Sequence, residues 1–153
     1  VLGGNTYYFV DGKPVTGLRK IGKTTYLFDS EGKQQRGWHV VGGKQMYFNE
    51  KNGGMWTGKR TIGKTTYLLG PDGGKLCGWH VLGGKKYYFH PEYGCGMVTG
   101  LRSIHGKAIY YFRITESKPG ANDRGSAVTN ATIVLNGKAH TFNANGVLIH
   151  VEP

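Results

Sequence analysis

The fold is decided by one stretch, Gly78-Trp79-His80-Val81-Leu82-Gly83-Gly84-Lys85-Lys86-Tyr87-Tyr88-Phe89. Two runs rich in aromatic and β-branched residues flank Gly83-Gly84, which predicts a β-hairpin, because glycine adopts positive φ in a two-residue turn without steric penalty. Residues 37–48 have the same length and turn, and residues 1–9 match from within the first strand onward. With the turn at 83–84, Trp79 lies opposite Tyr88 and His80 opposite Tyr87.

A variant of this hairpin alternates with it along the chain. It occupies residues 17–28 and 58–69, and a looser copy covers 101–112, so that opening glycines stand at positions 17, 37, 58, 78 and 100. A period of about 20 residues predicts units that bury their apolar faces by stacking on their neighbours. We therefore expect an all-β fold, a β-solenoid of six or seven stacked hairpins with almost no helix.

The period fails after the looser copy. Residues 116–125 are polar and rich in turn formers, which predicts a loop. Residues 132–142 then form a hairpin pattern around Asn136-Gly137, a strong turn signal, and residues 147–151 read as a last strand. We therefore divide the chain into a repeat array over residues 1–112, which begins within a repeat, and an irregular loop with a C-terminal hairpin cap over residues 113–153.

Cysteine content and charge leave alternatives open. Cys77 and Cys95 do not recur with the repeats, and their spacing alone does not establish a bridge across neighbouring hairpins. The formal net charge is +11. Lysines recur beside the predicted turns, which favours a role in protecting strand edges over a single polyanion surface. No nucleic-acid partner is expected.

Register separates two faces of the hairpin. One face keeps its apolar type in all copies and is the expected core, with Ile21, Tyr26 and Phe28 as its first example. The other face changes between copies, and only Trp38/Tyr47 and Trp79/Tyr88 place large aromatic pairs there. The candidate ligand-binding residues are Trp38, Tyr47, Gln45, Trp79, Tyr88, Lys86 and Trp56. The alternative is that these aromatic pairs only pack on the next hairpin.

The pattern Gly-Trp-x-x-x-x-Gly-Lys-x-Tyr-Tyr-Phe, followed by an Asn/Asp-Gly turn and Met-x-Thr-Gly, resembles the cell-wall-binding repeats of Gram-positive surface proteins. That family includes choline-binding modules, the glucan-binding repeats of glucansucrases and the receptor-binding repeats of large clostridial toxins. The resemblance covers residues 1 to about 112 and extends weakly to 137–146. It implies a non-catalytic binding module, without a cofactor, on a secreted protein or at the bacterial cell surface.

Several ligands are compatible with this resemblance. A choline site needs a cage of aromatic faces around a quaternary ammonium, but the variant copies open with Gly17-Leu18 and Gly58-Lys59 instead of Gly-Trp. A neutral carbohydrate of the wall or an extracellular glucan is therefore favoured. Choline, an anionic polymer such as teichoic acid contacted by Lys20, Lys59, Arg60 and Lys86, and a host protein remain alternatives.

Other classes of function are not supported by the sequence. The acidic residues at 11, 29, 31, 50, 72 and 92 fall in predicted turns, where they bond locally, and no carboxylate pair is spaced for acid–base catalysis. His39 and His80 occupy one equivalent position, which favours a structural role over a shared metal site. No run of eighteen apolar residues could span a membrane.

Overall fold

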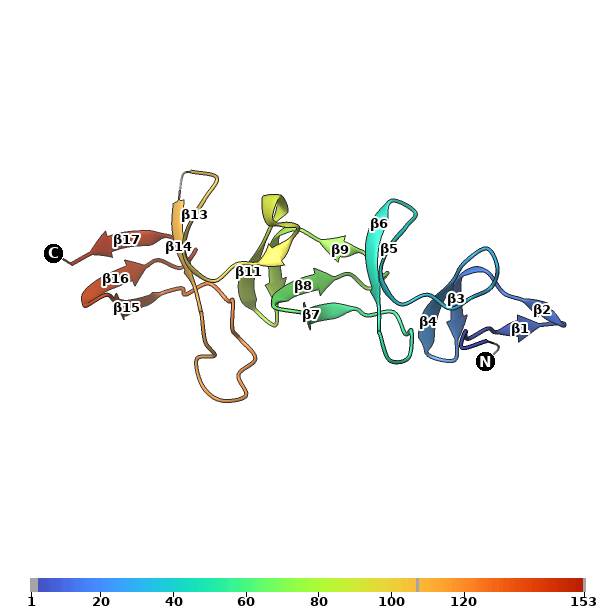
Figure 1. The fold of residues 1–153 in the computed structure, drawn as a ribbon. Coiled ribbons are helices and arrows are strands. Elements are labelled where there is room, and N and C mark those ends of the chain that lie inside the picture. The colour runs from blue at the N-terminus through green and yellow to red at the C-terminus, as the bar shows by residue number, and fades with distance from the viewer. Residues whose placement is uncertain (1–2, 107, 153) are drawn as a thin grey trace. The chain divides into compact units, whose positions relative to one another are not determined.

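The computed structural model describes residues 3–106 and 108–152 (Figure 1). These residues form seven antiparallel sheets of two or three strands. Their only helical element is a single 3₁₀ turn, η1, at Pro91–Tyr93. The predicted all-β fold of hairpin repeats is thus confirmed. The chain divides into two compact units, residues 1–76 and 77–153.

The first unit contains nine strands and the second contains eight among the described residues. In the first they are β1 (Phe9–Val10), β2 (Lys13–Pro14), β3 (Gly17–Ile21), β4 (Thr24–Phe28), β5 (Gly37–Val41), β6 (Lys44–Phe48), β7 (Gly58–Ile62), β8 (Thr65–Leu69) and β9 (Lys75–Leu76). In the second they are β10 (Gly78–Leu82), β11 (Lys85–His90), β12 (Gly96–Met97), β13 (Gly100–Ile104), β14 (Ala108–Phe112), β15 (Ala131–Leu135), β16 (Lys138–Phe142) and β17 (Leu148–Val151).

The predicted turns and register are confirmed. Gly83 and Gly84 have φ of 55° and 73°, the left-handed values that a two-residue primed turn requires. Trp79 pairs with Tyr88 and His80 with Tyr87. The hairpin β5–β6 repeats this register, with Trp38 opposite Tyr47.

Successive hairpins are joined by a residue of the linker that follows each one. In the first unit Gln34 pairs with Phe28 of its own hairpin, while its N–H donates to the carbonyl of Thr6, in the preceding repeat, at 2.8 Å. Met55 does the same one repeat later, with a 2.8 Å bond to Thr25. The linker residue therefore acts as a third strand that ties each hairpin to the one before it.

One large apolar side chain per repeat is fully buried. It is the residue of the second strand that pairs with the first residue of the hairpin, and it lies on the predicted core face. These residues are Phe28, Phe48, Leu69, Phe89, Phe112 and Phe142, and each is at most 2% exposed.

The C-terminal part of the second unit also follows the prediction. Asn136 and Gly137 both have positive φ, and β17 pairs with β16. The bridge that the sequence left open is present, since Cys77 and Cys95 form a disulfide with Cα atoms 4.9 Å apart. The expected boundary between the repeat array and the C-terminal cap, after residue 112, lies within the second unit. It stays a prediction.

Two glycines of one repeat provide a test of stacking. Gly22 and Gly32 both have positive φ, but a Cβ at Gly22 would meet no atom within 4 Å, whereas one at Gly32 would lie 2.6 Å from Cβ of Pro14. A left-handed alanine costs about 1–2 kcal/mol at either position. We expect Gly32→Ala to lower the free energy of unfolding in urea by more than Gly22→Ala, because only it also forces the repeats apart. Equal losses would show that Gly32 does not set the spacing.

Candidate functional site

The first aromatic cluster consists of Trp38, Tyr47, Trp56 and Tyr67. Trp38 and Tyr47 face each other across β5–β6 with ring centroids 5.2 Å apart. Trp56, in the linker after β6, lies 4.9 Å from Tyr47. Tyr67 comes from β8 of the next hairpin and meets Trp38 edge-on at 5.2 Å. Stacking of the repeats therefore brings together rings that lie 29 positions apart in sequence, from 38 to 67.

Two cations lie against this cluster. The Lys75 Nζ, from β9, is 5.2 Å from the Trp38 ring centroid and 5.5 Å from that of Tyr67. Burial of this half-buried side chain lowers the pKa of Lys75. The Arg60 guanidinium lies 5.4 Å from the Trp56 ring. All three distances are within the range of cation–π attraction.

Exposure differs sharply among these rings. Trp38 is 38% exposed, whereas Tyr47 is 8% exposed. Burial raises the pKa of Tyr47, and the charge of Glu50, 3.5 Å from the Tyr47 hydroxyl, adds to the effect. Gln45, on the same face as Trp38, is exposed. The exposed part of this face therefore includes the Trp38 indole and the Gln45 amide, with the Lys75 ammonium against the indole.

The second aromatic cluster consists of Trp79, Tyr88, Tyr110 and Phe112. Trp79 lies 5.0 Å from Tyr88, 4.9 Å from Tyr110 and 5.7 Å from Phe112. Lys86, next to the cluster on β11, places its Nζ 4.6 Å from the Trp79 ring and 6.0 Å from Tyr110. Tyr88 is 3% exposed and belongs to the core of the second unit.

A buried carboxylate fixes the loop beside the second cluster. Asp123, 2% exposed, accepts hydrogen bonds from the Ser117 amide at 2.8 Å and from the Lys85 Nζ at 3.0 Å. Hydrogen bonds from the hydroxyl and amide of Ser117, followed by Lys85, hold the pKa of Asp123 well below its usual range. The loop then returns to the sheet, where the Ala127 N–H donates to the Lys86 carbonyl at 2.7 Å.

The seven residues predicted from sequence fall into these two clusters. Trp38, Tyr47 and Trp56 meet in the first, with Gln45 on the face of Trp38 and Tyr47, whereas Trp79, Tyr88 and Lys86 meet in the second. Packing on the next hairpin, the alternative considered for the aromatic pairs, also occurs, because Trp38 contacts Tyr67 and Trp79 contacts Tyr110. Their role in ligand binding stays a proposal.

Sequence reasoning missed three rings of the clusters, Tyr67, Tyr110 and Phe112, and the Lys75 ammonium beside the first. Tyr67 and Tyr110 are equivalent positions, opposite Arg60 and Arg102 in their hairpins, but their register assigned them to the core face. Lys75 lies in a linker and belongs to no predicted strand. Both tyrosines could have been predicted from the stacking itself, because it places one face of a hairpin against the opposite face of the next copy.

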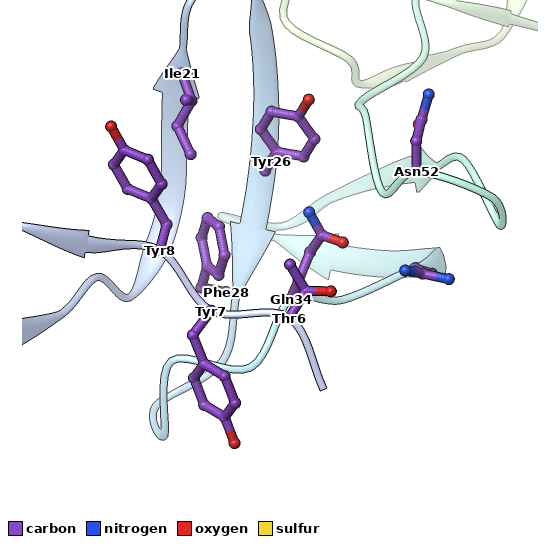
Figure 2. Close-up of a pocket in the computed structure, with 9 residues that line it drawn as sticks. Thr6, Tyr7, Tyr8, Ile21, Tyr26, Phe28, Gln34 and Asn52 are labelled. Carbon is purple, nitrogen blue, oxygen red and sulfur yellow. The ribbon is translucent and has the colours of Figure 1, made fainter. Parts of the chain in front are cut away.

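A pocket of about 300 Å³ occupies the equivalent place two hairpins earlier (Figure 2). Tyr8 and Tyr26 line it at the positions that Tyr47 and Tyr67 hold in the first cluster. Gln34, which pairs with Phe28 as Lys75 pairs with Leu69, stands at one side. Here an amide replaces the ammonium.

Asp29, Asp72, His39 and His80 make local hydrogen bonds, and Asp72 also forms an ion pair with Lys44 of the preceding repeat. Asp29 accepts hydrogen bonds from the amides of Glu31 and Lys33, and Asp72 from that of Gly74, as predicted for turn residues. The Nε2 of His39 lies 2.8 Å from the Arg36 carbonyl oxygen, and that of His80 lies 3.0 Å from the Cys77 carbonyl oxygen. In the described part of the chain, no group of three potential metal ligands occurs, and no helix is long and apolar enough to cross a membrane.

The fold and site define a class of protein: a β-hairpin repeat module with aromatic clusters between successive hairpins. Residues 15–59 match the family model of the choline-binding repeat. The structure of choline binding protein F from Streptococcus pneumoniae is similar over 94% of this chain, with 30% identity and a TM-score of 0.76. CbpJ from Streptococcus pneumoniae TIGR4 is similar over 96%, with 28% identity and a TM-score of 0.81. The Cpl-1 endolysin is similar over 93%, with 26% identity and a TM-score of 0.55.

These findings confirm the predicted resemblance to the choline-binding-type repeat family. No curated protein matches the sequence significantly. The chain covers 43% of choline binding protein F, 50% of CbpJ and 40% of Cpl-1, so it spans half the length of these relatives or less.

Asp123 provides a pH test of the loop beside the second cluster. Because its pKa is lowered in the folded protein, the carboxylate stabilises the fold fully above its unfolded pKa of about 3.9 and loses this effect as pH falls further. We expect Asp123→Asn to lower the melting temperature by a constant amount between pH 5 and 8, and by less below pH 4. Glu152→Gln, at an exposed position, is the control. A difference independent of pH down to 2 would contradict this role.

Proposed function

We propose that this chain is a non-catalytic module that binds a polymer of the bacterial cell wall through its two aromatic clusters. The favoured ligand is a neutral glycan, and the place of action is the cell surface or its surroundings. Sugar rings present apolar C–H faces with hydroxyl groups at their edges. A site for them combines an aromatic face with a few polar groups that fix orientation.

The observation that carries the proposal is the exposure of Trp38. Large aromatic side chains are usually mostly buried, but Trp38 is 38% exposed although two other rings, Tyr47 and Tyr67, pack against it. The exposed Gln45 amide, on the same face, supplies both a donor and an acceptor for hydroxyl groups. The ring is held in place by its neighbours, so little entropy is lost when a ligand stacks on it.

The relatives support the same class of ligand. Choline binding protein F was crystallised in the presence of a peptidoglycan analogue, a tetrasaccharide-pentapeptide. The Cpl-1 endolysin structure is a complex with a peptidoglycan analogue of the same kind. Two clusters on one chain would each bind weakly and gain strength together on a repeating polymer.

A second candidate is an anionic wall polymer of the teichoic-acid type. It is favoured by the Lys75 and Lys86 ammonium groups at the clusters and by the net charge of +11. Phosphate groups of such a polymer would pair with these ammonium groups. A host protein partner, the remaining alternative, would show binding that does not depend on sugar.

The first test is retention on insoluble cell walls and glucans. We expect Trp38→Ala to weaken binding at least tenfold, a loss of about 1.4 kcal/mol, because it removes the exposed ring. Val40→Ala is the matched control, since Val40 is on the same face and 69% exposed. Trp79→Ala is less informative because Trp79 packs against the core. If Trp38→Ala and Val40→Ala were retained equally well, Trp38 would not belong to the binding site.

The second test is salt dependence, which separates the two polymers. A neutral glycan held by stacking and hydroxyl hydrogen bonds releases no counterions, so its dissociation constant should change less than twofold between about 50 and 200 mM salt. A polymer held through several phosphates should lose tenfold or more over that range. The tenfold loss would reverse our preference for a neutral ligand.

A further inference from the structure

Each of the two tryptophans in the hairpin strands, Trp38 and Trp79, has one lysine ammonium of this chain against its ring. The Lys75 Nζ lies 5.2 Å from the Trp38 ring and the Lys86 Nζ 4.6 Å from the Trp79 ring. The two lysines hold different positions in the repeat. Lys75 is a linker residue, whereas Lys86 is in the second strand of the hairpin itself.

The two positions are exchanged between the clusters. Lys86 pairs with Val81 as Gln45 pairs with Val40, so Gln45 is its equivalent beside Trp38. Ala127 pairs with Phe112 as Lys75 pairs with Leu69, so Ala127 is the equivalent of Lys75 beside the second cluster. The first cluster therefore has Gln45 with Lys75, and the second has Lys86 with Ala127. Copying of one repeat does not produce this exchange, yet each tryptophan keeps one ammonium.

An ammonium at this place has a direct physical consequence. An aromatic face attracts a cation only within about 6 Å of the ring centroid, and here that space already holds an Nζ. A second cation there would be repelled by the positive charge of the lysine, a penalty that a neutral or anionic ligand does not meet. At the first cluster Lys75 also lies within 5.5 Å of Tyr67, so two of the rings that could face a cation share the same ammonium.

We propose that Lys75 and Lys86 close the two aromatic clusters to cationic ligands such as quaternary ammonium groups, and thereby restrict the module to neutral or anionic polymers. This inference rests on the binding function proposed above and specifies its ligand class. The two lysines are specificity-determining residues, and each acts on its own cluster. The Lys86 Nζ also donates to the Asn145 carbonyl oxygen at 3.5 Å, which helps to hold the ammonium at the cluster.

The chain itself supplies the substitutions for the test. Lys75→Ala gives the first cluster the residue found at Ala127, and Lys86→Gln gives the second the residue found at Gln45, so both are side chains that this fold accommodates at the same position. Choline and tetramethylammonium are titrated into each protein, and binding is followed by tryptophan fluorescence and by NMR of the indole N–H groups. Lys75→Arg, which keeps a cation, and Lys64→Ala, at an exposed turn, are the controls.

We expect wild type and both controls to show no saturable binding of either ligand up to about 10 mM. Lys75→Ala and Lys86→Gln should each gain a saturable site at least tenfold stronger, with signals from Trp38 and Trp79 respectively. Saturable binding of choline by the wild type at these tryptophans, or no gain in variants whose circular dichroism is unchanged, would overturn the inference. Failure of the proposed function would be seen in a different measurement, because the wild-type protein would then not be retained on cell walls or glucans.

Discussion

The rest of the structure depends on one backbone arrangement. A single linker residue pairs with the hairpin that it follows and also hydrogen-bonds to the hairpin before that one. A lone two-stranded hairpin is marginally stable in water, and the hairpins of this chain are only five residues per strand. Gln34, Met55 and Ala127 each pair with the end of their own hairpin and donate an N–H to the preceding one. This backbone link is independent of side-chain identity, which explains why glutamine, methionine or alanine can stand at this linker position while the stacking is kept.

The link also explains where the core is. It holds the end of each second strand against the neighbouring repeat, so that one phenylalanine or leucine per repeat is almost fully buried. Each such burial contributes on the order of 2 kcal/mol, a gain available only when a neighbour is present. Glycines such as Gly32 permit the close approach, because any side chain there would meet Pro14 of the preceding repeat.

The repeat period, the glycine turns and the register could all be read from the sequence, because they depend on contacts within 12 residues. The Trp79–Tyr88 pairing follows from the Gly83-Gly84 turn alone. The composition of the clusters could not be read in the same way. Tyr67 contacts Trp38 from the next hairpin, and Lys75 contacts it from a linker whose sequence has no strand pattern. These contacts depend on the angle and offset between hairpins, which no local pattern specifies. For the same reason, assigning one face to the core and the other to ligand was too simple for Tyr47 and Tyr88, whose rings are buried.

Because the backbone links between hairpins do not depend on side chains, residues of the aromatic clusters can be substituted without loss of the fold. Backbone links and buried end residues hold the hairpins, so side chains around Trp38 and Trp79 need only fill the space between repeats. At one repeat position the chain has Thr6, Gln45 or Lys86, and at another it has Gln34, Lys75 or Ala127. With Gln34 at the second position, Tyr8 and Tyr26 line a pocket that contains an amide. With Lys75 or Lys86, the cluster has an ammonium against its tryptophan. Ligand preference can therefore differ from repeat to repeat on one backbone, since a single substitution beside a ring exchanges a neutral group for a cation while the hydrogen bonds that stack the hairpins stay in place.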